Sequence, residues 1–236
     1  MEINCFPRWN TGSQITVHHP DMMIRHSHPD NHIETNMKTA LATLTAALLM
    51  TFSASAADVI EIDTPQLDNT VQKIYSAYCP FCYKYEQAVT PNLIKNLPTG
   101  TQFQAICLEN KGELGVEACE VLAAADTVSH KKYKQAKLAM YAAIHDQKLK
   151  SVKGSTAVKG ALAAIGLEAA DISPAEFKAA LASSTAQAKL AYDRTIAVKI
   201  AKKKGIPAIV VNGNKLIDTS TVSSLSDLDE TIAKNL

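Results

Sequence analysis

The 236-residue sequence has almost no net charge, because its 24 lysines and arginines nearly balance its 23 aspartates and glutamates. Nucleic-acid-binding proteins usually concentrate positive charge, so this composition gives no indication of that function. Cysteine is also scarce: the chain has five, and only one pair has the C-x-x-C spacing. A lone C-x-x-C can be half of a zinc site, but no second C-x-x-C supplies further ligands, so we expect no metal.

The first 56 residues do not have the pattern of a folded domain. Residues 1–36 contain five of the seven histidines and the only tryptophan, without apolar periodicity. A lysine after Met37, an apolar run over residues 40–52 and a Ser-Ala-Ser-Ala end are typical of a cleavable signal peptide. We therefore predict a signal peptide over residues 37–56, preceded by a disordered, non-native extension. A genuine cytoplasmic or metal-binding extension is the alternative.

Export would make disulfide bonds between the cysteines more favourable. Cleavage before Ala57 would leave a chain of one domain's length in the periplasm, an oxidising compartment in which disulfides persist. Neither the apolar run over residues 40–52 nor any other is long enough to span a bilayer as a helix. The extension holds Cys5, so the mature chain keeps an even number of cysteines: Cys79, Cys82, Cys107 and Cys119.

The C-x-x-C motif lies where a strand is expected to lead into a helix. Residues 71–75 are rich in β-branched and aromatic residues, and helical spacing begins at Tyr83. Cys79 would then lie at a helix N-terminus, where free N–H groups and the helix dipole favour a thiolate, and Pro80 suits the first helical position. We predict that Cys79 is the exposed attacking thiol and Cys82 the more buried resolving thiol of a redox-active disulfide.

Periodicity and turn signals predict the remaining elements. Strands are expected over residues 59–62, 71–75 and 102–108, and in a hairpin over 209–217. A helix from the motif to about residue 95, bent near Pro91, would complete a parallel βαβ unit. Further helices are expected over residues 116–125, 131–145, 156–165, 186–204 and 226–234, with another starting at Ser173. Asn212-Gly213 accepts positive φ angles in the hairpin turn, and Ser173 with Glu176 forms a capping box.

These features resemble the DsbA family of periplasmic thiol oxidases, and within it the DsbL branch. The resemblance covers essentially all of residues 57–236 and is carried by Cys-Pro-Phe-Cys at 79–82, Lys111-Gly112-Glu113, Tyr141-Ala142-Ala143 with His145-Asp146, and Gly205-Ile206-Pro207-Ala208. It implies an α/β thioredoxin-like fold, a central mixed β-sheet flanked by helices, over residues 57–111 and 194–236. An inserted α-helical domain is implied over residues 112–193.

The resemblance also implies a function. The family oxidises exported proteins by donating its disulfide, here Cys79–Cys82, and needs no other cofactor. A DsbB- or DsbI-like quinone reductase of the inner membrane would reoxidise the pair, and the DsbL branch implies an arylsulfate sulfotransferase as a client. A monomer is expected. The alternatives are a disulfide isomerase or reductase on the same scaffold, or a periplasmic metal-binding thioredoxin-like protein.

The same resemblance implies a second part of the site at Ile206-Pro207. In this fold the corresponding proline is cis and lies against the disulfide, which leaves the preceding backbone free to pair with a peptide. From the sequence alone, an ordinary trans proline at the start of a strand is the expected state, and the resemblance reverses that expectation. Pro80 and Phe81, between the two cysteines, are predicted to tune the motif.

Three features depart from the family pattern or remain open. Lys73 stands six residues before the first cysteine, where relatives carry a buried carboxylate, and its charge would favour the Cys79 thiolate unless it is only a snorkelling strand lysine. Glu86 is either a solvated helix residue, which we favour, or a proton relay. Cys107 and Cys119 could meet in a structural disulfide worth about 3 kcal/mol, or remain buried free thiols.

Overall fold

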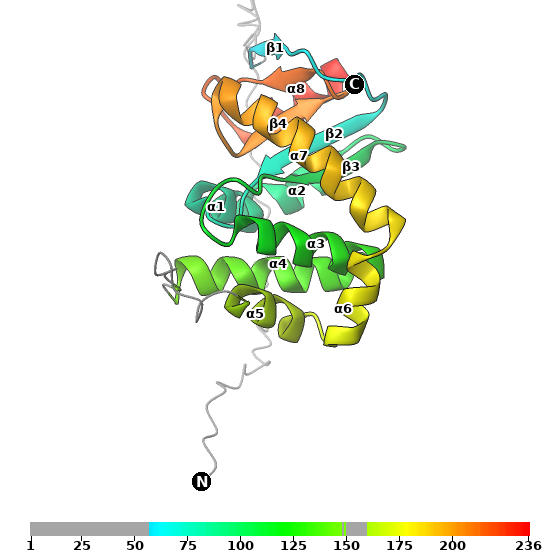
Figure 1. Cartoon of the computed structure of the whole chain (residues 1–236). Helices are drawn as coiled ribbons and strands as arrows, with labels where there is room; N and C mark the ends of the chain where they lie inside the picture. Colours follow the sequence, from blue (N-terminus) through cyan, green and yellow to red (C-terminus); the bar gives the residue numbers. More distant parts are fainter. Residues whose placement is uncertain (1–56, 148, 150–159) are drawn as a thin grey trace, which may run out of the picture. The chain divides into compact units, whose positions relative to one another are not determined.

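The computed structural model describes residues 57–147, 149 and 160–236 (Figure 1). The predicted extension and signal peptide, residues 1–56, lie outside the described residues. None of the helices in the described part of the chain is long and apolar enough to cross a membrane.

The fold is built on a five-stranded mixed sheet in the order β1-β5-β4-β2-β3. Among the strands of the described residues, only β2 and β3 run parallel, which confirms the predicted βαβ unit, and the other neighbours are antiparallel. The strands are β1 (Val59–Glu61), β2 (Thr70–Tyr75), β3 (Gln102–Cys107), β4 (Ala208–Val211) and β5 (Lys215–Ile217). The strand β3 therefore forms one edge of the sheet.

The hairpin between β4 and β5 follows the predicted turn. Asn212 and Gly213 both have positive φ angles, of 50° and 78°, which is the backbone conformation that such a tight turn requires. Asn212 is held further by its side chain, which donates to the carbonyl oxygens of Asn235 and Leu236 at the C-terminus. The turn thus fixes the strand pairing and also ties the last helix to the sheet.

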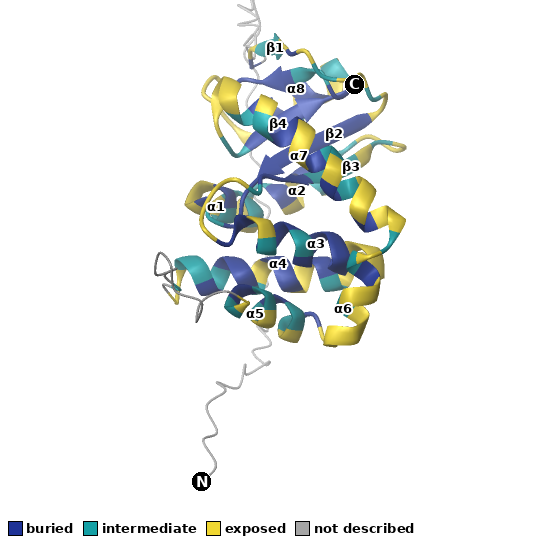
Figure 2. Ribbon diagram, viewed as in Figure 1, coloured by how far each residue is buried: buried dark blue, intermediate teal, exposed yellow. Residues whose placement is uncertain are grey.

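Helices cover both faces of the sheet (Figure 1). On one face, apolar strand residues pack against α2 (Thr90–Asn96) and α8 (Leu225–Asn235), and on the other they pack against α7 (Ser184–Lys204). The two sets alternate along the strands: Val71, Ile209 and Val211 belong to the first, and Ile74, Ala208 and Val210 to the second. Figure 2 shows the resulting buried strands as the darkest part of this region.

The helix that follows the C-x-x-C motif is divided in two. We predicted one bent helix, whereas the structure has α1 (Pro80–Ala88) and α2, with Val89 as the C-cap of the first and the N-cap of the second. Pro91 causes the break, because proline lacks an N–H and its ring would clash with the carbonyl of the preceding turn in a continuous helix.

The inserted region consists of helices, as predicted: α3 (Gly115–Val128), α4 (His130–His145), α5 (Ala161–Ala169) and α6 (Pro174–Leu181). We predicted a helix over residues 156–165, but α5 begins later, after Gly160, whose φ of 88° is not helical. Residues 156–159 lie outside the described residues. The capping box of Ser173 and Glu176 is confirmed at the start of α6.

The helix α7 connects the two predicted domains without interruption. It runs through the boundary that we predicted between residues 193 and 194 and packs on α3 at one end and on β2, β3 and β4 at the other. Figure 1 shows α7 running from the inserted helices to the sheet. Apolar residues of its buried stripe, Ile196 and Ile200 among them, belong to the core of the sheet.

Candidate active site

The two cysteines of the motif lie at the junction of β2 and α1. Cys79 is the N-cap of α1, with extended backbone, and Pro80 takes the first helical position. The N–H of Cys82 points at Cys79 Sγ from 3.2 Å, so the sulfur occupies the place of a capping oxygen. This is the arrangement that the sequence predicts for an activated first thiol.

Both thiols are buried in this structure, in which they are not bonded to each other. Cys82 is fully inaccessible and Cys79 is only 3% exposed, so the prediction of an exposed Cys79 is wrong. Cys79 is covered because its sulfur faces the loop before β4, where Sγ lies 3.6 Å from the carbonyl oxygen of Ile206. The two residues between the cysteines, Pro80 and Phe81, are both exposed, and 65% of the surface of Phe81 is accessible.

The environments of the two thiols move their pKa values in opposite directions. The pKa of Cys79 falls to about 6, mainly because the Cys82 thiol donates a hydrogen bond to it; burial opposes this, and the N–H groups of Cys82 and Phe81 and the charge of Lys111 assist. Burial raises the pKa of Cys82, and its hydrogen bond to Cys79 raises it further. Only Cys79 is therefore a thiolate near neutral pH.

Lys111 was not given a role by the sequence, because its position depends on a close approach of two loops. Gly112 packs so tightly on the ring of Tyr78 that a Cβ atom would lie 2.2 Å from it, and its φ is 82°. Only glycine fits there. The loop after β3 is thereby held beside the cysteines, which brings the positive charge of Lys111 to the site.

The loop before β4 supplies the other wall of the site. The Ile206–Pro207 peptide bond is cis, and Pro207 directly precedes the first residue of β4. The carbonyl of Ile206 is turned toward Cys79. We predicted from the sequence that Ile206-Pro207 lies beside Cys79 and Cys82, and the structure brings them together. Ile206 lies next to Cys79 although the two are 127 residues apart in the chain.

Comparison with known proteins decides which family has this arrangement. A family model described as thioredoxin matches residues 64–230. The DsbL thiol:disulfide interchange protein of Escherichia coli O6:H1 is 38% identical over 221 residues, which cover 85% of this chain and 95% of the relative. The chain belongs to the DsbA family of thiol:disulfide oxidoreductases. It is more similar to DsbL than to the DsbA of Salmonella typhimurium, which is 27% identical over 77% of this chain and 87% of that protein.

A solved structure with a similar sequence also has a similar fold. The crystal structure of DsbL from Salmonella enterica serovar Typhimurium matches with a TM-score of 0.69 and 35% sequence identity. The match covers 75% of this chain and 94% of that one. The thioredoxin-like α/β fold predicted from the sequence is therefore confirmed.

In this DsbA-family chain, two lysines take part in a buried charge cluster behind the cysteines. Lys73 is not a snorkelling residue: its side chain is 1% exposed, and its ammonium donates to Glu86 Oε2 at 2.7 Å and to Thr90 Oγ1 at 2.6 Å. Lys137 of α4 donates to the same Glu86 oxygen at 2.8 Å. We call Lys73, Glu86 and Lys137 the charge cluster.

The charge cluster corrects two interpretations drawn from the sequence, those of Glu86 and of Lys73. Glu86 is not a solvated helix residue, since its side chain is 11% exposed and bound by two lysines. Burial alone would raise its pKa, but the charges of Lys137 and Lys73 lower it below the usual value. The charge of Lys73 lowers the pKa of Cys82, whereas the lysine whose charge acts on Cys79 is Lys111.

Cys107 and Cys119 are joined by a disulfide, with Cα atoms 5.7 Å apart. It links the end of β3 to α3 and thus the sheet to the inserted helices. Both half-cystines lie in the same buried cluster as Cys79 and Cys82. The N–H of Cys107 donates to Asp193 of α7 at 2.9 Å, so three elements meet at this bridge.

Aromatic residues that the sequence reading left without a role connect α4 to the motif. The Tyr83 ring stacks on Tyr141 at 5.1 Å and on His145 at 5.6 Å between centroids. The Tyr83 hydroxyl donates to Asp146 at 2.7 Å, and His145 Nε2 lies 2.8 Å from the carbonyl oxygen of Ala77. These contacts fasten the C-terminal turn of α4 to both sides of the cysteine turn.

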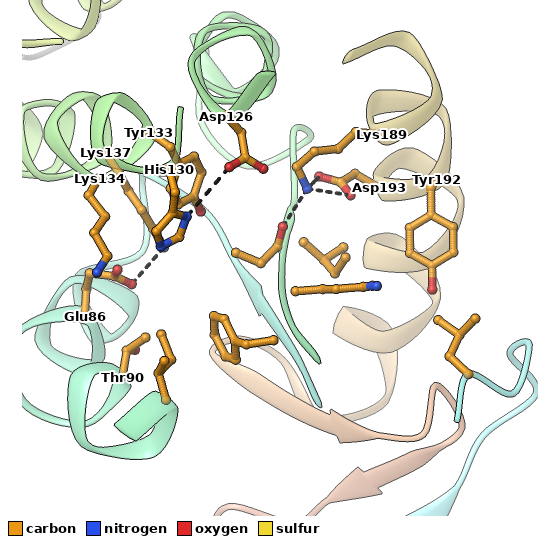
Figure 3. Close-up of a pocket in the computed structure, with 16 residues that line it drawn as sticks. Glu86, Thr90, Asp126, His130, Tyr133, Lys134, Lys137, Lys189, Tyr192 and Asp193 are labelled. Atoms are coloured by element: carbon orange, nitrogen blue, oxygen red, sulfur yellow. Dashed lines mark hydrogen bonds and ion pairs between the residues drawn. The ribbon is translucent and has the colours of Figure 1, made fainter. Parts of the chain in front are cut away.

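A pocket of about 430 Å³ opens beside the edge strand β3 (Figure 3). Its walls come from α1, α2, α3, α4 and α7, and neither Cys79 nor Cys82 lines it. Glu86 and Lys137 face it from one side, and Lys189 and Asp193 from the other. Among residues 57–147, 149 and 160–236, no group of three histidine, cysteine, aspartate or glutamate side chains is placed to hold a metal ion.

Proposed function

We propose that this DsbA-family protein is a periplasmic dithiol oxidase that donates a Cys79–Cys82 disulfide to exported proteins. The observation that supports this most directly is the low pKa of Cys79, about 6, beside a Cys82 whose pKa is raised. A disulfide that opens to a stabilised thiolate is readily reduced, and it therefore oxidises its partner.

The reaction has two exchange steps. A substrate thiolate attacks Cys79 Sγ, the Cys79–Cys82 bond breaks, and Cys82 leaves with the electron pair. A second substrate thiolate then attacks the substrate sulfur of the mixed disulfide, and Cys79 leaves as a thiolate. The substrate has lost two electrons and gained a disulfide, while the protein holds the reduced pair.

The substrate would bind along the loop that contains Ile206 and Pro207, next to the cysteines. Phe81 supports this placement, because a 65% exposed aromatic ring beside the reactive pair offers apolar contact to an unfolded chain. Lys84 Nζ lies 5.8 Å from the centre of that ring and adds a positive charge to the same surface. Binding would thus depend on backbone and apolar contacts rather than on one substrate sequence.

The reduced pair must pass its two electrons to an oxidant. We propose a DsbB- or DsbI-like quinone reductase of the inner membrane, and, from the similarity to DsbL, an arylsulfate sulfotransferase as one client. Both require export through the signal peptide at residues 37–56. N-terminal sequencing of the protein recovered from the periplasm tests this: we expect Ala57, and finding Met1 would contradict it.

The equilibrium of the Cys79–Cys82 pair with glutathione tests the oxidase assignment. We expect a potential well above that of thioredoxin, which is about −270 mV. A value at or below that level would instead favour a reductase on this scaffold. Measuring bound copper and zinc in the purified protein addresses the remaining alternative, a metal carrier, which predicts stoichiometric metal.

A further inference from the structure

Opening the Cys79–Cys82 disulfide leaves a negative charge on the buried sulfur of Cys82. Cys82 leaves as a thiolate, yet its side chain is fully inaccessible, and burial raises its pKa. A buried thiolate is costly, so Cys82 must receive a proton from inside the protein. Solvent cannot supply it directly, because Cys82 has no accessible surface.

Two facing rows of side chains connect Cys82 to the charge cluster. Cys82 and Glu86 are four residues apart on α1, and Lys137 and Tyr141 are four residues apart on α4, so each pair shares a helix face. Lys137 contacts Glu86 at 2.8 Å, and Tyr141 stacks on Tyr83, the neighbour of Cys82. The two contacts show that Lys137 and Tyr141, one helical turn apart on α4, both pack against α1.

The Tyr141 hydroxyl is the open link between these rows. It is buried and has no hydrogen-bond partner among the described residues, although such a group normally finds one. Burial raises its pKa, and among the surrounding titratable groups Cys82 raises it most, so Tyr141 can pass a proton on only if another group replaces that proton. A buried hydroxyl without a partner, on the side of α4 that packs against the motif helix, is available to donate to a sulfur that becomes charged.

Lys137 is the member of the charge cluster that can release a proton. Glu86 Oε2 accepts from both lysines, so the cluster holds one positive charge more than it balances. Burial and the charge of Lys73 lower the pKa of Lys137 to about 8, although Glu86 opposes this. Its ammonium also lies 4.0 Å from the ring centre of Tyr75 and 5.2 Å from that of Tyr133.

The other groups around Lys137 are poorer proton sources. Burial raises the pKa of Tyr75 and of Tyr133, and their hydroxyls bind each other at 3.1 Å. Lys73 is fully buried, donates to both Glu86 and Thr90, and does not line the pocket. The remaining charged groups on the pocket walls are Asp126, His130, Lys134, Lys189 and Asp193.

The pocket gives Lys137 a path to solvent that is separate from the substrate face. Lys137 and Glu86 both line it, and Figure 3 shows the two side chains meeting at its wall. Glu86 is the partly exposed member of the cluster, at 11% of its side chain. Water that enters beside β3 therefore reaches the ion pair without passing the cysteines.

We propose that Lys137, through the Tyr141 hydroxyl, supplies the proton that Cys82 takes up when the disulfide opens, and regains it from water in the pocket. This step rests on the proposed function. As the substrate thiolate bonds to Cys79 Sγ and Cys82 leaves with the electron pair, Tyr141 O–H protonates Cys82 and Lys137 N–H reprotonates Tyr141. The neutral Lys137 amine then takes a proton from solvent, and closure of the disulfide reverses the sequence.

The experiment follows a single reaction of the oxidised protein with excess glutathione, quenched with acid and analysed by mass for the mixed disulfide at Cys79. Lys137→Met and Tyr141→Phe should each slow this step, Lys137→Met by about 100-fold, as expected for loss of a proton donor. Lys137→Arg should be equally slow, because arginine keeps the charge and the contact with Glu86 but does not release a proton. Lys131→Met, which removes an exposed lysine of the same helix, should react at the wild-type rate.

A wild-type rate for Lys137→Met or for Tyr141→Phe overturns the proposal, and so does a wild-type rate for Lys137→Arg, which would show that charge alone matters. If these variants do not fold, the wild-type protein decides. Its rate, corrected for glutathione thiolate, should fall as the pH rises through about 8 and should show a solvent isotope effect; absence of both refutes the proposal. A wild-type protein that forms no mixed disulfide at Cys79 would instead refute the proposed function.

Discussion

The Lys73 ammonium lies 2.7 Å from the Glu86 carboxylate, in the interior between β2 and α1. A charge pair at this depth is stable only when both partners remain, because an unpaired charge there would lose its hydration without compensation. Here the second lysine, Lys137, binds the same carboxylate oxygen, so the three residues depend on one another unequally. Removing either lysine leaves a balanced pair, whereas removing the carboxylate leaves two buried cations.

The charge cluster therefore predicts an order of stabilities. Glu86→Gln should lower the free energy of unfolding by about 3–5 kcal/mol, since it leaves Lys73 and Lys137 without a counter-charge. Lys73→Met should cost clearly less, because the pair of Glu86 and Lys137 persists. Urea unfolding of the reduced proteins measures both. Equal losses in the two variants would contradict the shared-carboxylate account.

A second prediction concerns which lysine acts on Cys79. Lys111→Met should raise the pKa of Cys79 above its value of about 6, because the charge of Lys111 helps to lower it. Lys73→Met should have the smaller effect on Cys79, since the charge of Lys73 is held by Glu86. Thiolate absorbance against pH in the reduced protein compares the two, with Cys82 retained because its hydrogen bond is the main cause of the low pKa of Cys79. A larger shift with Lys73→Met would restore the interpretation drawn from the sequence.

The sequence predicted those parts of the site that depend on local chemistry. Cys79 as a helix N-cap, Pro80 after it and the turn at Asn212-Gly213 follow from the residues within a few positions, and the structure has all three. The order of strands and helices was likewise readable, because the periodicity changes at each junction. The break at Pro91 and the displaced start of α5 are errors at element boundaries, where local signals are weakest.

The charge cluster and the environment of Cys79 were not predictable in this way. Lys137 is far from the motif in the chain, and only the packing of α4 on α1 brings it to Glu86. One signal was available: Tyr133, Lys137 and Tyr141 form a row at helical spacing, and a lysine within an otherwise aromatic row indicates a buried partner. The burial of Cys79 depends on the loop at Ile206, which no local pattern reveals.

The difference between the two thiols predicts different trapping of substrates. Cys82→Ala should accumulate mixed disulfides through Cys79, because only Cys79 is ionised near pH 7 and nothing remains to resolve the bond. Cys79→Ala should trap none. Non-reducing electrophoresis of periplasmic extracts from strains that express each variant measures this. Equal trapping by both would mean that the roles are assigned wrongly.

The bridge between Cys107 and Cys119 should contribute to stability without taking part in exchange. It closes a loop with a sequence separation of 12 residues, for which chain entropy gives about 3 kcal/mol. The Cys107→Ala/Cys119→Ala double variant should lose about this much in urea unfolding and keep the glutathione equilibrium of Cys79–Cys82. In native oxidised protein, a thiol reagent should label neither residue, and labelling of both would contradict the bridge.

The last prediction is that the reduced protein gains stability over the oxidised protein as the pH rises from 5 to 8. The Cys79 thiol titrates at about 6 in the folded reduced state and at about 8.5 when unfolded. Its depressed pKa stabilises the fold fully above the unfolded value and not at all below the folded one. Between these limits the gain changes by about 1.4 kcal/mol per pH unit.

At pH 7 the reduced form should hold about 1.4 kcal/mol of this stabilisation, and at pH 8 about 2.5 kcal/mol. The disulfide form has no thiol at Cys79 and gains nothing, so the difference between the two forms isolates the effect, while charges common to both cancel. Urea unfolding of each form at pH 5, 6, 7 and 8 measures it. Higher pH is avoided because Cys82, whose pKa is raised in the fold, would then ionise only on unfolding and oppose the trend. A difference that stays constant or reverses with pH would show that the Cys79 thiolate is not the source of the oxidising character.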